Sequence, residues 1–145
     1  MKLYTIGFTR SSAAHFFGRL IDAGVKRVID VRLNNTSQLS GFAKMPDLAW
    51  FLKSLGNINC RHEPLLAPTR DMLDDYRKRK GAWEDYESRF RALMTERRIE
   101  DHLDPASMDG ACLLCSEAQP HHCHRRLVAE YLGEKWSEEL EIGHL

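Results

Sequence analysis

The sequence lacks the features that would direct it to a membrane, to a nucleic-acid polymer or to a disulfide-stabilised fold. No apolar stretch approaches the ~20 residues of a membrane span, so no membrane partner is expected. Lys and Arg total 21, as do Asp and Glu, and this zero net charge leaves only a local basic patch for nucleic acid. Only four cysteines occur, and no secretory signal is seen at the start, which favours reduced thiols in a cytoplasmic protein.

The remaining pattern is that of an α/β protein. The 145 residues suit one domain, 1–145, that buries roughly 70% of its unfolded surface. Apolar runs alternate with segments of helical spacing, and no internal repeat or linker interrupts them. The alternation predicts a single-domain three-layer sandwich, with a mostly parallel sheet of about five strands and helices on both faces. The strands are expected at 3–7, 25–31, 57–63, 111–117 and 139–144, and the clearest helices before Gly24, before Gly56, over 83–97 and over 123–132.

The segment from Cys112 to Arg125 holds three of the four cysteines and three of the seven histidines. In an extended strand, Cys112 and Cys115 point to opposite faces and lie roughly 10 Å apart, which is too far for one zinc ion. Cys112 is therefore interpreted as a small buried residue. Cys115 lies near the carboxyl end of the strand and shares a face with Glu117. The pattern places both where α/β proteins carry their chemistry.

The next three reactive residues, Cys123, His124 and Arg125, are expected in the first turn of a helix that Pro120 opens. Free backbone N–H groups and the helix dipole stabilise negative charge there and lower the pKa of a cysteine. Cys123 is thus a candidate thiolate, Arg125 a candidate anion clamp, and His124 or His122 a candidate acid or base. The alternative is that these residues cap the helix and satisfy loop carbonyls.

Further polar residues are expected at the same edge, because the carboxyl ends of parallel strands point the same way. Asp30 and Arg32 share a face at the end of the second strand, and Arg10 and Ser11 follow the first. They are candidates for substrate binding, while the simpler alternative is that Asp30 pairs with Arg32. The basic run Arg77–Lys80 is interpreted as a solvated surface, with phosphate or nucleic-acid contact as the alternative.

Three sequence elements, taken in order, resemble the domain of unknown function 488 family. They are Tyr4-Thr-Ile-Gly7, Ile29-Asp-Val-Arg32, and Leu114-Cys-Ser-Glu117 followed by Cys123-His-Arg125. The resemblance extends over essentially the whole chain, with Phe8 at a position where the family has a histidine. No activity is established for the family. The resemblance implies a compact α/β fold and a pocket formed by Asp30, Arg32, Cys115, Glu117, Cys123, His124 and Arg125.

The leading hypothesis is an enzyme, a cysteine-dependent hydrolase or transferase, that acts on an anionic small molecule. The substrate would be a nucleotide, a phosphorylated metabolite or a sulfur donor. Cys123 or Cys115 would be the nucleophile, Arg125 and the helix N-terminus would bind the anion, and Glu117 or His124 would move protons. The sequence assigns neither a cofactor nor an oligomeric state.

A metal site is the first alternative hypothesis. Cys115, Cys123 and one or more of His121, His122 and His124 would bind zinc or iron, with His122 as the preferred histidine. Thiolate and imidazole are ligands that suit both metals, and a loop between strand and helix can bring them together.

A non-enzymatic binding module is the second alternative. Arg70, the run Arg77–Lys80 and the Cys-His-Arg edge would contact nucleic acid or a protein partner. Binding of that kind weakens steeply with added salt, which makes the hypothesis easy to separate from the other two.

Overall fold

A computed structural model describes residues 1–36, 40–136 and 139–145 of the chain. Two single-turn 3-10 helices, at Gly41–Ala43 and Pro64–Leu66, lie between the larger elements. The strands and α-helices follow one another as β1 (Lys2–Gly7), α1 (Ala13–Asp22), β2 (Arg27–Asp30), α2 (Asp47–Gly56), β3 (Asn59–His62), α3 (Arg70–Arg77), α4 (Trp83–Arg97), α5 (Ile99–His102), α6 (Pro105–Met108), β4 (Ala111–Cys115), α7 (His124–Lys135) and β5 (Glu141–His144).

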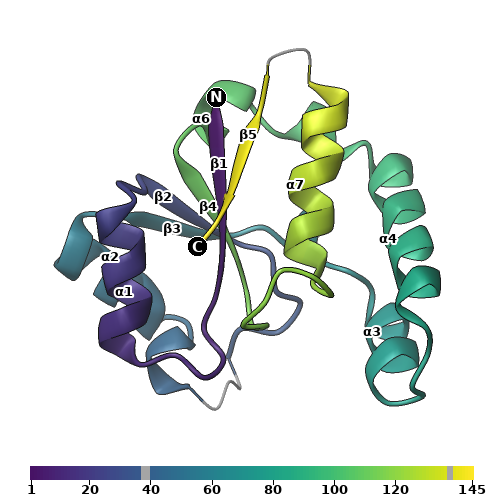
Figure 1. The fold of residues 1–145 in the computed structure, drawn as a ribbon, viewed down its shortest axis with the longest axis horizontal. Helices are drawn as coiled ribbons and strands as arrows, with labels where there is room; N and C mark the ends of the chain where they lie inside the picture. Colours follow the sequence, from purple (N-terminus) through teal and green to yellow (C-terminus); the bar gives the residue numbers. More distant parts are fainter. Residues whose placement is uncertain (37–39, 137–138) are drawn as a thin grey trace.

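The described strands form one sheet in the order β3-β2-β4-β1-β5, and every pairing is parallel (Figure 1). This confirms the predicted α/β fold. β4 lies at the centre of the sheet, where Cys115 is opposite Gly7 of β1 and Leu114 is opposite Asp30 of β2. All five residues of β4 are buried, because helices cover a parallel sheet on both faces.

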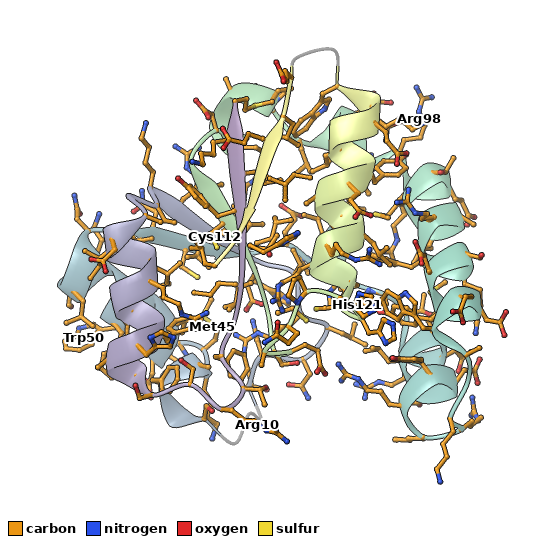
Figure 2. The ribbon with its side chains drawn as sticks, in the orientation of Figure 1. Arg10, Met45, Trp50, Arg98, Cys112 and His121 are labelled. Carbon is orange, nitrogen blue, oxygen red and sulfur yellow. The ribbon has the colours of Figure 1, made fainter. Side chains whose placement is uncertain are left out.

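Two helical layers enclose the sheet and create two separate cores (Figure 1). α1 and α2 pack on one face, where they bury Phe16, Leu20 and Leu52. α4 and α7 pack on the other face. Cys112 belongs to the α1–α2 core (Figure 2) and Cys115 to the α4–α7 core, as the alternation of side chains along β4 predicts.

The order of the strands creates a switch point beside β4. The chain leaves β2 toward α2 on one face, whereas it leaves the neighbouring β4 toward α7 on the opposite face. Adjacent loops that depart to opposite faces open a crevice at the carboxyl ends of the strands, and this is where open α/β sheets bind ligands. Cys115, the last residue of β4, lies at this point.

The loop after β4 differs from the prediction at both ends. The expected strand 111–117 ends at Cys115, and Glu117 therefore lies in the loop. Just beyond the strand, the carbonyl of Ser116 still accepts hydrogen bonds from the backbone and hydroxyl of Thr9, and the chain then crosses the end of β1 at Glu117. The following helix begins at His124, with Cys123 as its N-cap residue, so the loop is longer than the sequence suggests.

Helix α3 was not predicted, because its sequence is mostly charged. Thr69 caps it by accepting a hydrogen bond from the backbone N–H of Met72 at 3.2 Å. Met72, Leu73 and Tyr76 then pack against the α4–α7 core. Among the described residues, no helix has both the length and the apolar composition needed to span a membrane.

Candidate functional site

Cys115 carries its thiol on the α7 side of the sheet. Its Sγ lies 3.5 Å from Nδ1 of His124, the first residue of α7. Nε2 of the same imidazole lies 2.7 Å from the carbonyl oxygen of Val31, directly after β2. Because a carbonyl oxygen only accepts hydrogen bonds, Nε2 carries a proton and Nδ1 faces the sulfur. A cysteine, a base and a group that orients the base are the parts of an activated nucleophile.

Several donors favour the thiolate form of Cys115. The thiol of Cys123 donates to it, and this lowers the pKa of Cys115 by more than burial raises it. The charge and N–H of His124 and the backbone N–H of Ser116 lower this pKa further. The same sulfur–sulfur hydrogen bond, together with burial, raises the pKa of Cys123. Of the two cysteines that the sequence left open, Cys115 thus has the lowered pKa and Cys123 the raised one.

The imidazole of His124 is held rigidly in the protein interior. Burial alone lowers the pKa of His124, but the Cys115 thiolate and the Val31 carbonyl raise it by more, and the net shift is upward. The edge of the ring meets Phe90, with ring centroids 5.6 Å apart and planes at 89°. A thiolate–imidazolium pair is therefore stabilised in a setting where water competes little.

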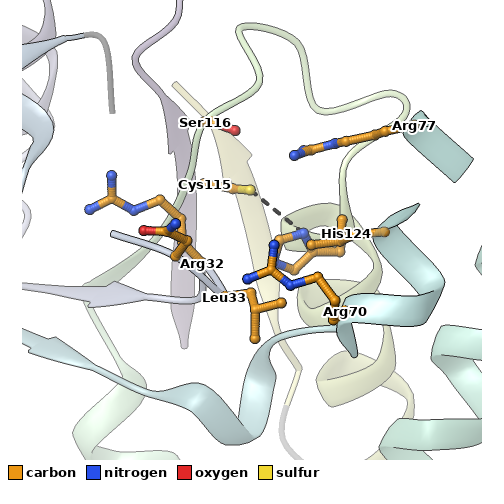
Figure 3. A pocket seen from close by; sticks show the side chains of 9 residues that line it. Arg32, Leu33, Arg70, Arg77, Cys115, Ser116 and His124 are labelled. Carbon is orange, nitrogen blue, oxygen red and sulfur yellow. Dashed lines mark hydrogen bonds between the residues drawn. The ribbon is translucent and has the colours of Figure 1, made fainter. Parts of the chain in front are cut away.

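A cavity of about 220 Å³ opens over Cys115 (Figure 3). The end of β2, the end of β4 and helix α3 surround it. In Figure 3, the guanidinium groups of Arg70 and Arg77 point from α3 toward its centre. It is lined by Arg32, Leu33, Asn34, Arg70, Leu73, Arg77, Cys115, Ser116 and His124.

The two arginines of α3 give the cavity a positive wall. Arg77 forms an ion pair of 3.5 Å with Glu117, and both side chains are about half exposed. Among the described residues, the side chain of Arg70 has no ion-pair or hydrogen-bond partner. Lys78 and Arg79 instead pair with aspartates of α3 and lie outside this lining. The predicted basic run is thus divided, and only Arg77 faces the cavity.

Sequence reasoning missed Arg70 and Arg77 as residues of this site. It interpreted the run Arg77–Lys80 as a solvated surface and named Arg70 only in the alternative of a binding module, since no helix was predicted there. A signal was present: the Thr69 cap and the apolar residues that follow it define a helix with one face toward the core. Arg70 and Arg77 are seven residues apart on that helix, which is two turns and therefore the same face.

Asp30 and Arg32 form a buried ion pair, which is the simpler of the two interpretations. Nε and one terminal nitrogen of Arg32 donate to the two Asp30 oxygens at 2.8 and 2.9 Å, and another donates to the Ala43 carbonyl at 2.7 Å. Asn35 also donates to Asp30. Phe8 lies 5.3 Å from the guanidinium carbon. Arg32 borders the cavity, but its charge is neutralised by Asp30.

Arg125 lies in the protein interior instead of the cavity. Its side chain is fully buried, and it donates to Thr5 Oγ1 at 3.3 Å and to the carbonyl oxygen of Glu117. A Cβ atom at Gly7 would stand 1.6 Å from that carbonyl oxygen and 2.9 Å from the guanidinium. Glycine at position 7 therefore lets the loop after β4 cross the end of β1, and Arg125 holds the loop there.

Arg10 and Ser11 line a separate cavity of about 360 Å³ on the α1 side of β1. Arg19 donates to Ser11 Oγ at 3.3 Å and to the Gly7 carbonyl at 3.0 Å in the wall of that cavity. Arg10 is exposed and adopts a left-handed backbone conformation with φ 61°. Neither residue borders the cavity over Cys115.

Three of the described residues could hold a metal ion together. The ligand atoms of Cys115, Cys123 and His124 lie within 4.8 Å of one another. Ligands of a tetrahedral zinc stand about 3.8 Å apart, so a small contraction would suffice. The histidine of this cluster is His124, whereas His122 stacks on Trp83 with ring centroids 4.8 Å apart.

Comparison with known proteins identifies one relationship. No curated protein and no solved structure gives a significant match to the chain. A family model does match, over residues 12–132 of the 145, and its description is domain of unknown function DUF488. That range contains Asp30, Cys115, Cys123 and His124, and it covers most of the chain. The chain therefore belongs to the DUF488 family.

Proposed function

We propose that this protein is an enzyme in which the thiolate of Cys115 attacks a small anionic substrate held by Arg70 and Arg77. The observation that carries the proposal is the position of the Cys115–His124 pair at a cavity with two guanidinium groups in its wall. A nucleophile, a base and a cationic wall within one cavity are the parts that such chemistry requires.

The residues have separate tasks in this proposal. His124 takes the proton of Cys115, and the Val31 carbonyl holds the imidazole in place. Arg70 and Arg77 attract the anion and reduce the repulsion between substrate and thiolate. The anion would replace Glu117 as a partner of Arg77, since their ion pair is long and solvent-exposed. Reduced thiols of this kind fit a cytoplasmic protein, and all four cysteines are free.

A panel of phosphate monoesters, nucleotides and thiosulfate, assayed with the Cys115→Ser and Cys60→Ser variants, tests the proposal. We expect Cys115→Ser to abolish turnover of the substrate that the wild-type protein accepts, because a serine hydroxyl is not ionised near neutral pH. Cys60 lies on β3 and lines no part of this cavity, so Cys60→Ser should retain full activity. Equal turnover by the Cys115→Ser and wild-type proteins would refute the proposal.

A metal centre is the second candidate, and the cluster of Cys115, Cys123 and His124 favours it. In that case the two sulfurs and Nδ1 would bind zinc or iron, and the Val31 carbonyl would orient the ligand histidine. Elemental analysis of protein purified without chelator separates the two functions. One equivalent of metal, lost in Cys123→Ser, supports the metal centre, and folded metal-free protein with a reactive Cys115 supports the nucleophile.

A further inference from the structure

Two of the four cysteines meet in one buried site, and only one of them faces the cavity. The sulfurs of Cys115 and Cys123 lie within 4.8 Å of each other. Cys115 lines the cavity, whereas Cys123 is not among its lining residues. Cys60 and Cys112 contribute to the core on the other face of the sheet. A substrate in the cavity therefore reaches Cys115 first, with Cys123 as the nearest other thiol.

Cys123 places its thiol beside that of Cys115. It is the N-cap residue of α7, yet its side chain makes no capping hydrogen bond with the helix. Its backbone is extended, with φ −134° and ψ 138°, and its side chain is buried. The sulfur thus remains available to Cys115. A disulfide has an S–S length of about 2.05 Å, so the two sulfurs need to approach by at most roughly 3 Å.

From this arrangement we infer that Cys123 is the resolving thiol of Cys115, and that the substrate is a sulfane-sulfur anion such as thiosulfate. The inference rests on the proposed function, because Cys115 must be the nucleophile. A thiol beside the nucleophile can act as a second nucleophile when the first step leaves an electrophilic sulfur on Cys115. A phosphoryl group on Cys115 would present phosphorus to water and would give Cys123 no sulfur to attack.

The first half-reaction transfers sulfur to Cys115. Its thiolate attacks the outer sulfur of thiosulfate, a new S–S bond forms, and the S–S bond of thiosulfate breaks. Sulfite leaves with the electron pair, and Cys115 becomes a persulfide anion. Arg70 and Arg77 stabilise the sulfonate charge that sulfite carries away.

The second half-reaction uses Cys123. Its thiol gives up a proton and attacks Sγ of Cys115, so that the Sγ–Sγ bond forms and the bond to the transferred sulfur breaks. That sulfur leaves as hydrosulfide with the electron pair and the proton. An external dithiol then reduces the Cys115–Cys123 disulfide and is oxidised to a disulfide itself. Atoms and charge balance in both steps.

A single-turnover experiment with reduced protein and thiosulfate tests the inference. Sulfite and hydrosulfide are measured, and intact mass reports on the cysteines. The wild-type protein should release one equivalent of each product and end as a Cys115–Cys123 disulfide, two hydrogens lighter. Cys123→Ser and Cys123→Ala should still release sulfite but no hydrosulfide, and should retain one extra sulfur on Cys115. Cys60→Ser is the matched control and should behave as the wild-type protein.

Each other outcome has a defined meaning. Hydrosulfide released at the wild-type rate by both Cys123 variants would overturn the resolving role. No sulfite from the wild-type protein would overturn the assignment of a sulfane-sulfur substrate, while the substrate panel above still tests the proposed function. Sulfite released by Cys115→Ser would overturn both, because the nucleophile would then lie elsewhere. Circular dichroism of the Cys123→Ala variant establishes that a lost product does not reflect unfolding.

Discussion

Arg77 should make Cys115 react faster with an anionic reagent than with a neutral reagent of the same shape. Iodoacetate and iodoacetamide form such a pair, and both alkylate a thiolate at sulfur. In the wild-type protein the positive wall of the cavity attracts the carboxylate of iodoacetate. Arg77→Ala removes one of the two guanidinium groups and also leaves the carboxylate of Glu117 without its partner. The ratio of the two alkylation rate constants should therefore fall.

The size of this effect follows from the dimensions of the cavity. A space of about 220 Å³ places a bound carboxylate on the order of 6 Å from a guanidinium in its wall. At that distance a pair of unit charges gains about 0.7 kcal/mol in water and about 3 kcal/mol at an effective dielectric constant near 20. The Arg77 side chain is 48% exposed, so solvent screens the interaction strongly. We therefore expect Arg77 to contribute about 1 kcal/mol to the attraction of iodoacetate, which corresponds to a roughly fivefold change in the ratio of the two alkylation rate constants.

The assay is peptide mass spectrometry of Cys115 after timed alkylation at low salt with each reagent. Arg79→Ala is the matched control, because Arg79 belongs to the same basic run but pairs with Asp75 away from the cavity. Glu117→Gln should change the ratio in the opposite direction, since it releases Arg77 from its ion pair. A ratio that stays constant in Arg77→Ala, or that falls equally in Arg79→Ala, would show that Arg77 does not act on anions at this site.

Two further predictions concern stability. Gly7→Ala places a Cβ atom 1.6 Å from the Glu117 carbonyl oxygen and should lower the free energy of unfolding, measured in urea, by about 2–5 kcal/mol. The control Gly18→Ala places a Cβ atom that meets nothing within 4 Å and should raise the free energy of unfolding by about 0.5–1 kcal/mol. Equal stability of the two variants would contradict this prediction. Burial and the Asp30 carboxylate raise the pKa of Cys60 from 9.0 to about 12. As the pH rises, the unfolded chain therefore loses the thiol proton before the folded protein does, and the free energy of unfolding falls between pH 9.0 and about pH 12. This decrease amounts to at most about 1.4 kcal/mol per pH unit and should be absent in the Cys60→Ser variant. If the free energy of unfolding of the variant and of the wild-type protein changed with pH in parallel, the prediction would be wrong.

The sequence predicted the sheet well because the strands have simple patterns. β-branched and apolar runs marked β1, β2 and β4, and alternation alone placed Cys112 and Cys115 on opposite faces. The order of the strands, and hence the crevice beside β4, depends on long-range pairing that no local pattern encodes.

The composition of the site was harder to predict than its location. α3 is charged along most of its length, so its arginines resembled solvated surface residues until packing showed one face turned to the core. Arg125 is one residue along the helix from His124, and a step of about 100° turns it away from the cavity toward β1. The start of α7 could not be fixed from sequence, because Pro120 suits a loop as well as a first helical turn.

The matched family region leaves out the strands that close one side of the sheet. β1 ends at Gly7 and β5 begins at Glu141, both outside residues 12–132. A chain trimmed to the matched range would lose two of the five strands and would expose the backbone of β4 as an unpaired edge. Unpaired hydrophobic edges recruit other chains. Expression of the family region by itself should therefore yield aggregates, and engineering of this site should start from a chain that includes β1 and β5.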